Sequence, residues 1–321
     1  MAKPPPPLFC MKGEMSSVHS LAYKLDDDRS LLFAGTQTGH VHVWDLRVNR
    51  ECAKFSAGDD PILSIHCVNS RLLITQSKIG NVGIWEEIDD QWTLKQSLPQ
   101  AYLSFCKSVI GSLNGEWVIV CADSNSVIQV LSLTKYNVVL SLKNENAEEK
   151  LGEVMALKFV KTSEKKLLLS IYESCSLFLW DVSDKKVISK VKISEECPMA
   201  LDFDESSMRG LCGSSDDNLV AFKLDAANCL IRKAEIKLTN PGVSSIKIRP
   251  DNKIVAVGCW EGTIRILSWR SLKLLAVLDH HDSTIHEICF SIKPVISWKA
   301  KILMAAGSKD GKISIWDLYN E

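Results

Sequence analysis

The sequence predicts an all-β fold, a β-propeller of seven four-stranded blades. One short pattern recurs seven times along the 321 residues: a turn, then apolar residues at alternate positions, then a large apolar residue. Successive copies lie about 41 to 49 residues apart, which is the length of one such blade. The repeated segments alternate with period 2 and are rich in Val, Ile and Leu, so helical repeats of similar length do not fit.

The seven copies define the third strand of each expected blade. They span residues 39–45, 80–86, 126–132, 176–181, 218–223, 262–268 and 311–317. Four copies carry a tryptophan at the end of the strand, where a large aromatic side chain is expected to pack against the neighbouring blade. These blade-packing residues are Trp44, Trp85, Trp180 and Trp316.

The sixth repeat shows all four strands of a blade. We expect them at residues 243–248, 253–257, 263–267 and 272–278, with turns at residues 250–252 and 261–262. An isolated blade would expose two apolar faces, so each blade needs a neighbour on both sides.

The last repeat lacks a fourth strand of its own. Residues 8–12 read as a strand without a partner, and we expect this segment to complete the last blade and remove its open edge. Residues 1–7, with four consecutive prolines, are expected to be a flexible leader. Residues 1–321 are then a single domain.

Composition narrows the function classes. Lys+Arg and Asp+Glu number 38 and 39, and the net charge of −1 creates no overall field for nucleic acid or an anionic membrane. The 11 cysteines include no CxxC pair, which favours reduced thiols. The chain has no apolar run long enough to span a membrane. We expect a monomeric cytoplasmic and nuclear protein that binds neither nucleic acid nor membrane.

The last repeat contains a set of polar residues that could be mistaken for a catalytic triad. His281, Ser308, Asp310 and Trp316 resemble the hydrogen-bonded tetrad of WD40 blades, which ties loops together. No nucleophile elbow accompanies them. His40 and His42 could supply two metal ligands, but no further His or Cys stands at ligand spacing. We predict no catalytic site, no metal and no cofactor.

Two turns of the sixth repeat, residues 238–242 and 259–262, are expected to open on one face. Trp260 lies outside the packing position, so it is either an interface anchor or a side chain folded over its own blade. The candidate protein-binding face comprises Thr239, Asn240, Trp260, Glu261, Glu195, Glu196, Asp216, His280 and Lys309.

The chain is similar to one branch of the WD40 proteins, the guanine nucleotide-binding protein subunit beta-like protein 1 and ASTRA-associated protein family. The similar segments include residues 238–242, 248–251, 269–270, 275–278 and 307–310. The resemblance implies a non-enzymatic adaptor that acts with the Tel2-Tti1-Tti2 co-chaperone assembly in maturation of phosphatidylinositol-3-kinase-related kinases. A G-protein γ subunit is not expected as a partner, because no long helix precedes the first repeat.

An alternative function follows from residues 44–47. Trp44, Asp45 and Arg47 match the WDxR motif of propellers that act as substrate receptors of cullin-based ubiquitin ligases. Such a tetrapeptide also arises wherever a strand ends in Trp-Asp, so the motif alone does not decide between the two functions.

Overall fold

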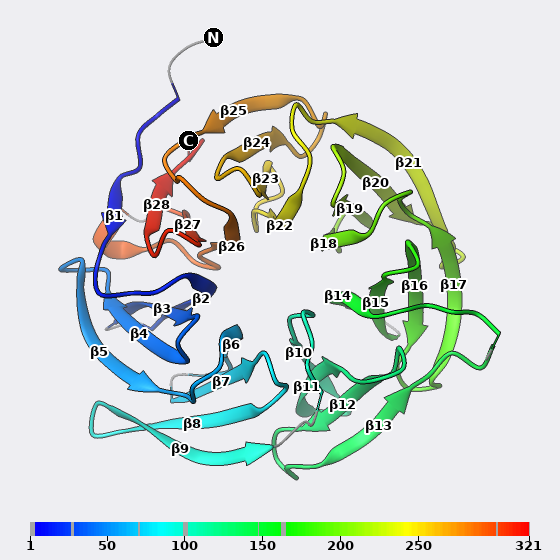
Figure 1. Cartoon of the computed structure of the whole chain (residues 1–321), viewed down its shortest axis with the longest axis horizontal. Coiled ribbons are helices and arrows are strands. Elements are labelled where there is room, and N and C mark those ends of the chain that lie inside the picture. Colours follow the sequence, from blue (N-terminus) through cyan, green and yellow to red (C-terminus); the bar gives the residue numbers. More distant parts are fainter. Residues whose placement is uncertain are drawn as a thin grey trace. The chain divides into compact units, whose positions relative to one another are not determined.

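The structure, a computed structural model, describes residues 4–26, 29–69, 71–98, 102–146, 148–161, 165–299 and 301–320. In these residues the strands form seven four-stranded antiparallel sheets, joined by turns and one short 3₁₀ helix, η1 (Ile296–Trp298). The fold class is therefore a seven-bladed β-propeller, as predicted (Figure 1). Two compact units divide the chain, Met1–Ser97 with Lys247–Glu321, and Leu98–Ile246.

The strands of each blade follow one another in sequence, apart from β1 (Phe9–Met11). The first and second blades consist of β2 (Val18–Leu25), β3 (Ser30–Thr36), β4 (His40–Asp45) and β5 (Arg50–Ser56), and of β6 (Ile62–Cys67), β7 (Leu72–Ser77), β8 (Val82–Ile88) and β9 (Gln91–Leu98). The third and fourth consist of β10 (Val109–Leu113), β11 (Glu116–Ala122), β12 (Ile128–Ser132) and β13 (Val138–Leu142), and of β14 (Val154–Lys161), β15 (Lys166–Tyr172), β16 (Ser176–Asp181) and β17 (Lys186–Lys192).

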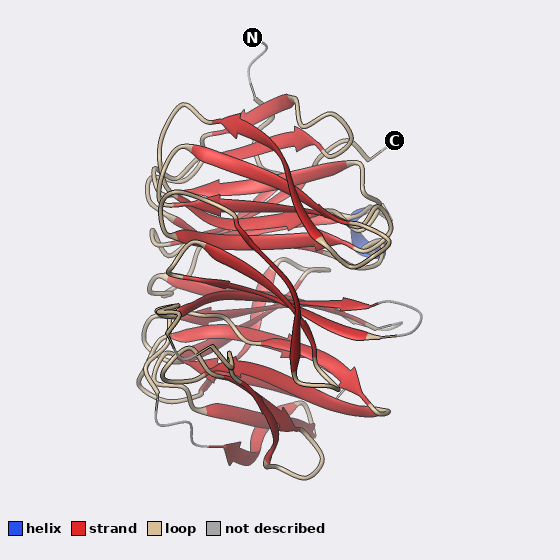
Figure 2. Cartoon of the chain, turned by 90° about the vertical axis from the view of Figure 1, so that its right-hand side faces the viewer, coloured by secondary structure: helices blue, strands red, loops and turns tan. Residues whose placement is uncertain are grey.

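The fifth blade consists of β18 (Pro198–Asp204), β19 (Arg209–Ser214), β20 (Asn218–Leu224) and β21 (Leu230–Lys237). The sixth contains β22 (Val243–Ile248), β23 (Ile254–Cys259), β24 (Ile264–Ser268) and β25 (Leu274–Leu278), close to the predicted strands. In the seventh, β26 (Ile285–Phe290), β27 (Leu303–Ser308) and β28 (Ile313–Asp317) are joined by β1. Strands dominate the described residues (Figure 2), and none of these residues forms a helix long and apolar enough to cross a membrane.

The second and third strands of the blades are buried almost throughout, whereas outer strands such as β5 and β25 are more exposed. A strand that is covered on both faces has apolar residues at nearly every position, and this accounts for the sequences of β3 and β23. The four tryptophans of the third strands are all packed in the core, as predicted: Trp44, Trp85, Trp180 and Trp316.

Strand β1 completes the last blade. It pairs antiparallel with β28, with Phe9 opposite Ile315 and Met11 opposite Ile313, and the Leu8 N–H donates to the Ile315 carbonyl at 2.8 Å. Figure 1 shows the two strands side by side. Met11 is fully buried in a cluster with Trp44 of the first blade. The predicted closing strand is confirmed, and it also joins the cores of two blades.

The leader before β1 lies partly outside the described residues. Residues 1–3 are not described, so their predicted flexibility stays a prediction. Pro4 to Pro7 line a shallow hollow together with Asp279, His280 and Trp316 of the seventh blade.

Deleting residues 1–12 should lower the melting temperature strongly, because it uncovers the edge of β28 and removes the buried Met11 side chain. Truncation of a buried Met alone costs about 2–5 kcal/mol. Deleting only residues 1–7 is the matched control and should leave the melting temperature close to that of the full chain. Thermal unfolding of the two deletion variants compares these effects, and equal melting temperatures would contradict the role of β1.

Candidate functional site

Four side chains of the seventh blade form one continuous hydrogen-bonded chain. The His281 Nδ1 lies 3.0 Å from an Asp310 carboxylate oxygen, and its Nε2 lies 2.7 Å from the Ser314 hydroxyl. The Trp316 indole N–H donates to the same hydroxyl at 2.7 Å. With Nδ1 protonated, His281 donates to Asp310 and accepts from Ser314. A neutral imidazole therefore satisfies every group in the chain.

The predicted tetrad named Ser308, and the structure corrects this residue to Ser314. Ser308 instead donates to the Ser283 carbonyl at 2.9 Å and accepts from the Asp310 N–H at 3.2 Å. Ser314 stands two residues before Trp316, so strand alternation places both side chains on one face of β28. Opposite Ser314, β27 carries Ala306, which has no hydroxyl to offer.

In two other blades the indole partner lies on the second strand. Trp85 donates to the Thr75 hydroxyl and Trp180 to the Ser170 hydroxyl, both at 2.9 Å. The corresponding position in the first blade is Ala34, and the buried Trp44 indole nitrogen has no hydrogen-bond partner among the described residues. The four tryptophans thus share a packing role but not a hydrogen-bonding role.

None of the four hydrogen-bonded side chains of the seventh blade is placed to act as a nucleophile. Ser314 is fully buried, and its hydroxyl is engaged by both Trp316 and His281. A catalytic serine must reach a substrate, so this arrangement ties loops together as a structural element. Within the described ranges, no three His, Cys, Asp or Glu side chains are grouped to hold a metal ion.

Burial sets the protonation of His281. It lowers the pKa of the imidazole, although the hydrogen bond and charge of Asp310 act in the opposite direction. Burial also raises the pKa of Asp310, but the hydrogen bonds from the Lys312 N–H and His281 outweigh it, and the pKa of Asp310 lies below its usual value. The pair is therefore a neutral imidazole beside a carboxylate at neutral pH.

In the unit that contains Lys247–Glu321, Trp260 is the exposed aromatic of the predicted face. Its side chain is 42% exposed, so a large part of the ring is open to solvent. The turn that carries it is fixed: its carbonyl accepts a hydrogen bond from the Thr284 hydroxyl at 3.0 Å, and Gly262, at φ +92°, closes the turn onto the Cys259 carbonyl. A rigid backbone thus presents a large aromatic ring to solvent.

The other predicted residues of this unit differ in accessibility. Lys309 is exposed. The Glu261 carboxylate accepts hydrogen bonds from Thr263 and the buried Arg265, each at 2.7 Å, so it holds the turn of Trp260. His280 packs edge-on against Trp316, with ring centroids 6.3 Å apart, and its Nε2 is buried. Glu261 and His280 are therefore structural neighbours of the surface.

In the unit Leu98–Ile246, the predicted residues also fall into two groups. Thr239, Asn240, Glu195 and Glu196 are exposed. Asp216 is partly buried and accepts hydrogen bonds from Ser214 and from the backbone and side chain of Asn218, so it shapes the β19–β20 turn. Glu195 pairs with Lys192.

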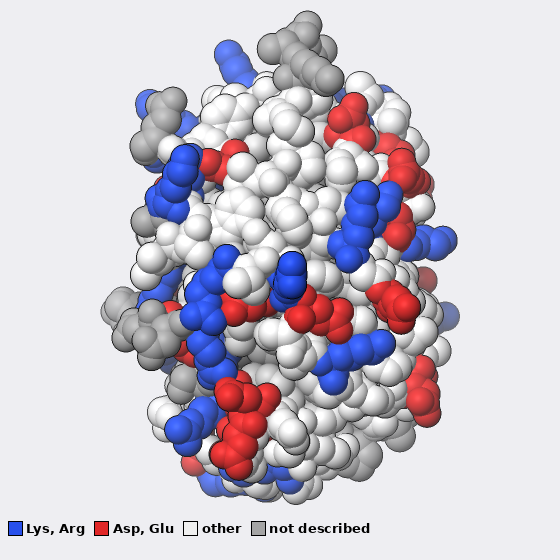
Figure 3. All heavy atoms as spheres, turned by 90° about the vertical axis from the view of Figure 1, so that its left-hand side faces the viewer, with Lys and Arg blue, Asp and Glu red and all other residues white. Residues whose placement is uncertain are grey.

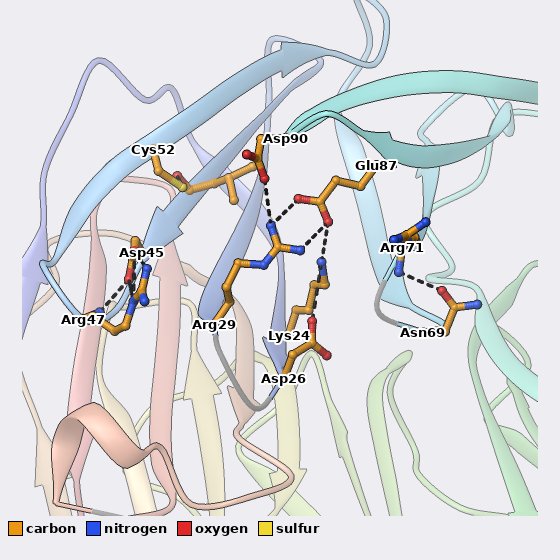
Figure 4. A network of polar contacts seen from close by, with 11 residues as sticks. Lys24, Asp26, Arg29, Asp45, Arg47, Cys52, Asn69, Arg71, Glu87 and Asp90 are labelled. Carbon is orange, nitrogen blue, oxygen red and sulfur yellow. Dashed lines mark hydrogen bonds and ion pairs between the residues drawn. The ribbon is translucent and has the colours of Figure 1, made fainter.

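The WDxR motif lies at the end of β4. Trp44 is buried, and Asp45 accepts hydrogen bonds from the Arg47 N–H and guanidinium, each at 2.8 Å (Figure 4). The hydrogen bond from the Arg47 side chain lowers the pKa of Asp45. The Arg47 side chain is 53% exposed, but its ion pair with Asp45 holds it at the end of the strand.

A second polar network joins the first and second blades. Glu87 on β8 accepts two hydrogen bonds from the Arg29 guanidinium, at 2.6 and 2.8 Å, and one from Lys24 at 2.8 Å (Figure 4). The Lys24 ammonium is buried and also lies 5.0 Å from the centre of the Trp92 ring. Sequence reasoning missed this network because its members belong to different repeats and carry no local motif.

Surface charge gives no single-sign field on the face shown in Figure 3. Lys and Arg side chains alternate with Asp and Glu side chains, with uncharged areas between them. A partner on this face is therefore selected by local patches and not by net charge.

Replacing Trp316 and Trp44 by Phe should lower the free energy of unfolding by different amounts, because only one of the two indoles makes a hydrogen bond with a described residue. Trp316→Phe should destabilise more than Trp44→Phe, by about 1–2 kcal/mol, because only Trp316 donates to a buried hydroxyl. Urea unfolding of both variants measures the difference. Equal losses would show that the indole hydrogen bond contributes nothing beyond packing.

Stability should also depend on the protonation of His281. Since the pKa is lowered in the folded state, the unfolded chain binds the proton more tightly. Stability is then complete above pH ~6.5 and falls by up to about 1.4 kcal/mol per pH unit as the pH drops below that value. Unfolding measured from pH 7.5 to 5 should show this fall in the native chain, and a shallower fall in His281→Gln. Parallel curves would exclude His281 as the group responsible.

Comparison with known proteins agrees with this architecture. The family model described as "WD domain, G-beta repeat" matches residues 6–45, 234–268 and 272–317. The chain is 25% and 24% identical to the ASTRA-associated protein 1 of Schizosaccharomyces japonicus and of Schizosaccharomyces pombe, over 98% of this chain and 99% of each relative.

A mouse relative is more similar. Guanine nucleotide-binding protein subunit beta-like protein 1 of Mus musculus is 33% identical over 98% of this chain and 97% of its own length. The resemblance expected from the sequence is thus confirmed. The chain belongs to the WD40-repeat family of guanine nucleotide-binding protein subunit beta-like protein 1.

Proposed function

We propose that this protein is a non-enzymatic adaptor that acts with the Tel2-Tti1-Tti2 co-chaperone assembly in the maturation and stability of phosphatidylinositol-3-kinase-related kinases. The observation that carries the proposal is similarity along nearly the whole chain to proteins named for their association with ASTRA. A WD40 propeller is a protein-interaction scaffold, which is the architecture that such an adaptor requires.

Trp260 is the residue best placed to anchor a partner. Tryptophan is enriched among the residues that dominate binding energy, because it buries a large area and loses little side-chain entropy. Here 42% of the side chain is still exposed, while the Thr284 and Cys259 hydrogen bonds already hold its turn. Binding then buries the ring without a further cost of ordering the backbone.

The remaining expectations form part of the same proposal. An adaptor of cytosolic and nuclear kinases would work in the cytoplasm and nucleus as a monomer, without nucleic acid, membrane or a G-protein γ subunit as partner.

The alternative, a substrate receptor of a cullin-based ubiquitin ligase, rests on Arg47 of the WDxR motif. The hydrogen bonds of Arg47 to Asp45 compete with such an interaction, so we favour the co-chaperone function.

Trp260→Ala should weaken binding to the purified Tel2-Tti1-Tti2 assembly at least about tenfold, because it removes a central aromatic anchor. Trp117→Ala is the matched control, since Trp117 is similarly exposed, at 44%, but lies on β11. Asn240→Ala separately tests the exposed turn of the other unit. Affinities are measured by calorimetry with variants of unchanged melting temperature.

Each outcome of this experiment has a separate meaning. If the native protein does not bind the assembly, the proposed function is wrong, and capture of a ligase adaptor would favour the alternative. If Trp260→Ala and Trp117→Ala both bind like the native chain, the function stands and Trp260 is not the anchor.

A further inference from the structure

The connection between β26 and β27 is unlike the corresponding connections of the other blades. It spans residues 291–302 and contains η1. In the first six blades the connection between the first and second strands is shorter, and it runs over residues 26–29, 68–71, 114–115, 162–165, 205–208 and 249–253. The seventh blade therefore carries an insertion at this end of its sheet.

The insertion is held in one conformation by its contacts. Val295 is fully buried in the cluster that also contains Met11, and its N–H donates to the Lys301 carbonyl at 2.8 Å. The Trp298 indole donates to the Leu46 carbonyl at 2.9 Å, next to the β4–β5 turn. Ile296 lies between these two anchors, and Ile292 lies between Val295 and Ser291, whose N–H donates to the Leu303 carbonyl at 2.9 Å, so both side chains stand on a fixed backbone.

Two isoleucines of this fixed segment point to solvent. Ile292 and Ile296 are each 74% exposed, more than any other large hydrophobic side chain in the described part of the chain. Val48, 61% exposed, lies on the β4–β5 turn to which Trp298 is bound. We call Val48, Ile292 and Ile296 the insertion patch. The hydrogen bonds of Ser297 and Trp298 to the Leu46 carbonyl join the two segments that carry these side chains, and exposed apolar side chains gathered on a fixed backbone are typical of a protein-binding surface.

The charge around the insertion patch has one sign. Residues 291–302 include Lys293, Lys299 and Lys301 but no Asp or Glu. Lys301 pairs with Asp317, whereas Lys293 and Lys299 are exposed and form no ion pair with any described residue. The Arg47 charge next to Val48 is balanced by Asp45. Lys293 and Lys299 thus add positive charge beside the apolar side chains, with no ion-pair partner among the described residues.

We propose that the insertion patch binds an acidic, apolar segment of a partner protein, such as an amphipathic helix with Leu or Phe on one face and Asp or Glu beside it. The apolar face would cover Ile292 and Ile296, and the carboxylates would pair with Lys293 and Lys299. A second copy of this chain fits poorly, because a two-fold contact through the patch brings lysines together.

This surface is distinct from that of Trp260. Trp260 follows the end of the second strand of the sixth blade, whereas the insertion precedes the start of the second strand of the seventh. The two surfaces lie at opposite ends of these strands, so one partner segment cannot reach both by the same contact. The inference does not depend on the identity of the partner assigned to Trp260.

A random-peptide display library selected on the full-length protein tests the proposal directly. Peptides that bind the native chain are then passed over the variant Ile292→Ser/Ile296→Ser. Because both positions are exposed, this variant removes apolar side chains of the insertion patch without altering the core. The peptides lost in this step should be apolar and net acidic. Their affinity should fall about tenfold or more in this variant and in Lys293→Glu/Lys299→Glu. It should also weaken as salt is raised.

Two controls accompany the selection. Leu274→Ser/Leu275→Ser alters exposed apolar side chains on β25, at 50% and 43% exposure, and should leave the affinities unchanged. Trp260→Ala should also leave them unchanged. The proposal is overturned if no bound peptide depends on the insertion patch, if the dependent peptides are not acidic, or if the β25 control weakens them equally. Should the serine variant not fold, the charge-reversal variant decides by the same criteria.

Discussion

The pairing of β1 with β28 is the constraint on which the arrangement of the first and seventh blades depends. A three-residue strand supplies few backbone hydrogen bonds, but it covers the edge of β28 and places Met11 in one buried cluster with Trp44 of the first blade and Ile313 of the seventh. The same cluster contains Val295, which anchors the insertion before β27. One short strand therefore supports the last sheet, the contact between two blades and the segment that displays Ile292 and Ile296.

Most of the fold could be predicted because it depends on local pattern. Period-2 alternation and the repeat spacing located the third strands, and the position of Trp44, Trp85, Trp180 and Trp316 predicted their burial. The partner of each indole was not predictable in the same way. Thr75 and Ser170 lie on second strands, and the corresponding residue of the seventh blade is Ala306, which has no hydroxyl. The Trp316 indole donates to Ser314 on its own strand instead.

The candidate surface was predicted in part. Trp260 could be placed in a turn from the sequence, but the hydrogen bonds to the Trp260 and Cys259 carbonyls that fix this turn could not. Glu261 pairs with Arg265 and His280 contacts the Trp316 ring, so both are partly buried, and their part in binding stays a prediction. Networks such as Lys24 with Glu87, and the anchoring of η1 on Leu46, join distant repeats and leave no local signal.

The β1–β28 pair also has a consequence for biosynthesis. Ribosomes deliver the amino-terminal segments of a chain first, and domains tend to fold in that order. Phe9–Met11 is made before any of the strands β2 to β27, whereas its partner Ile313–Asp317 follows all of them. Until Ile313–Asp317 has been made, β1 has no partner strand, and the first-blade side chains that share the cluster of Met11 have no seventh-blade side chains to pack against. The seventh sheet joins segments that lie far apart in the sequence, so it can be completed only after the six other blades have been made.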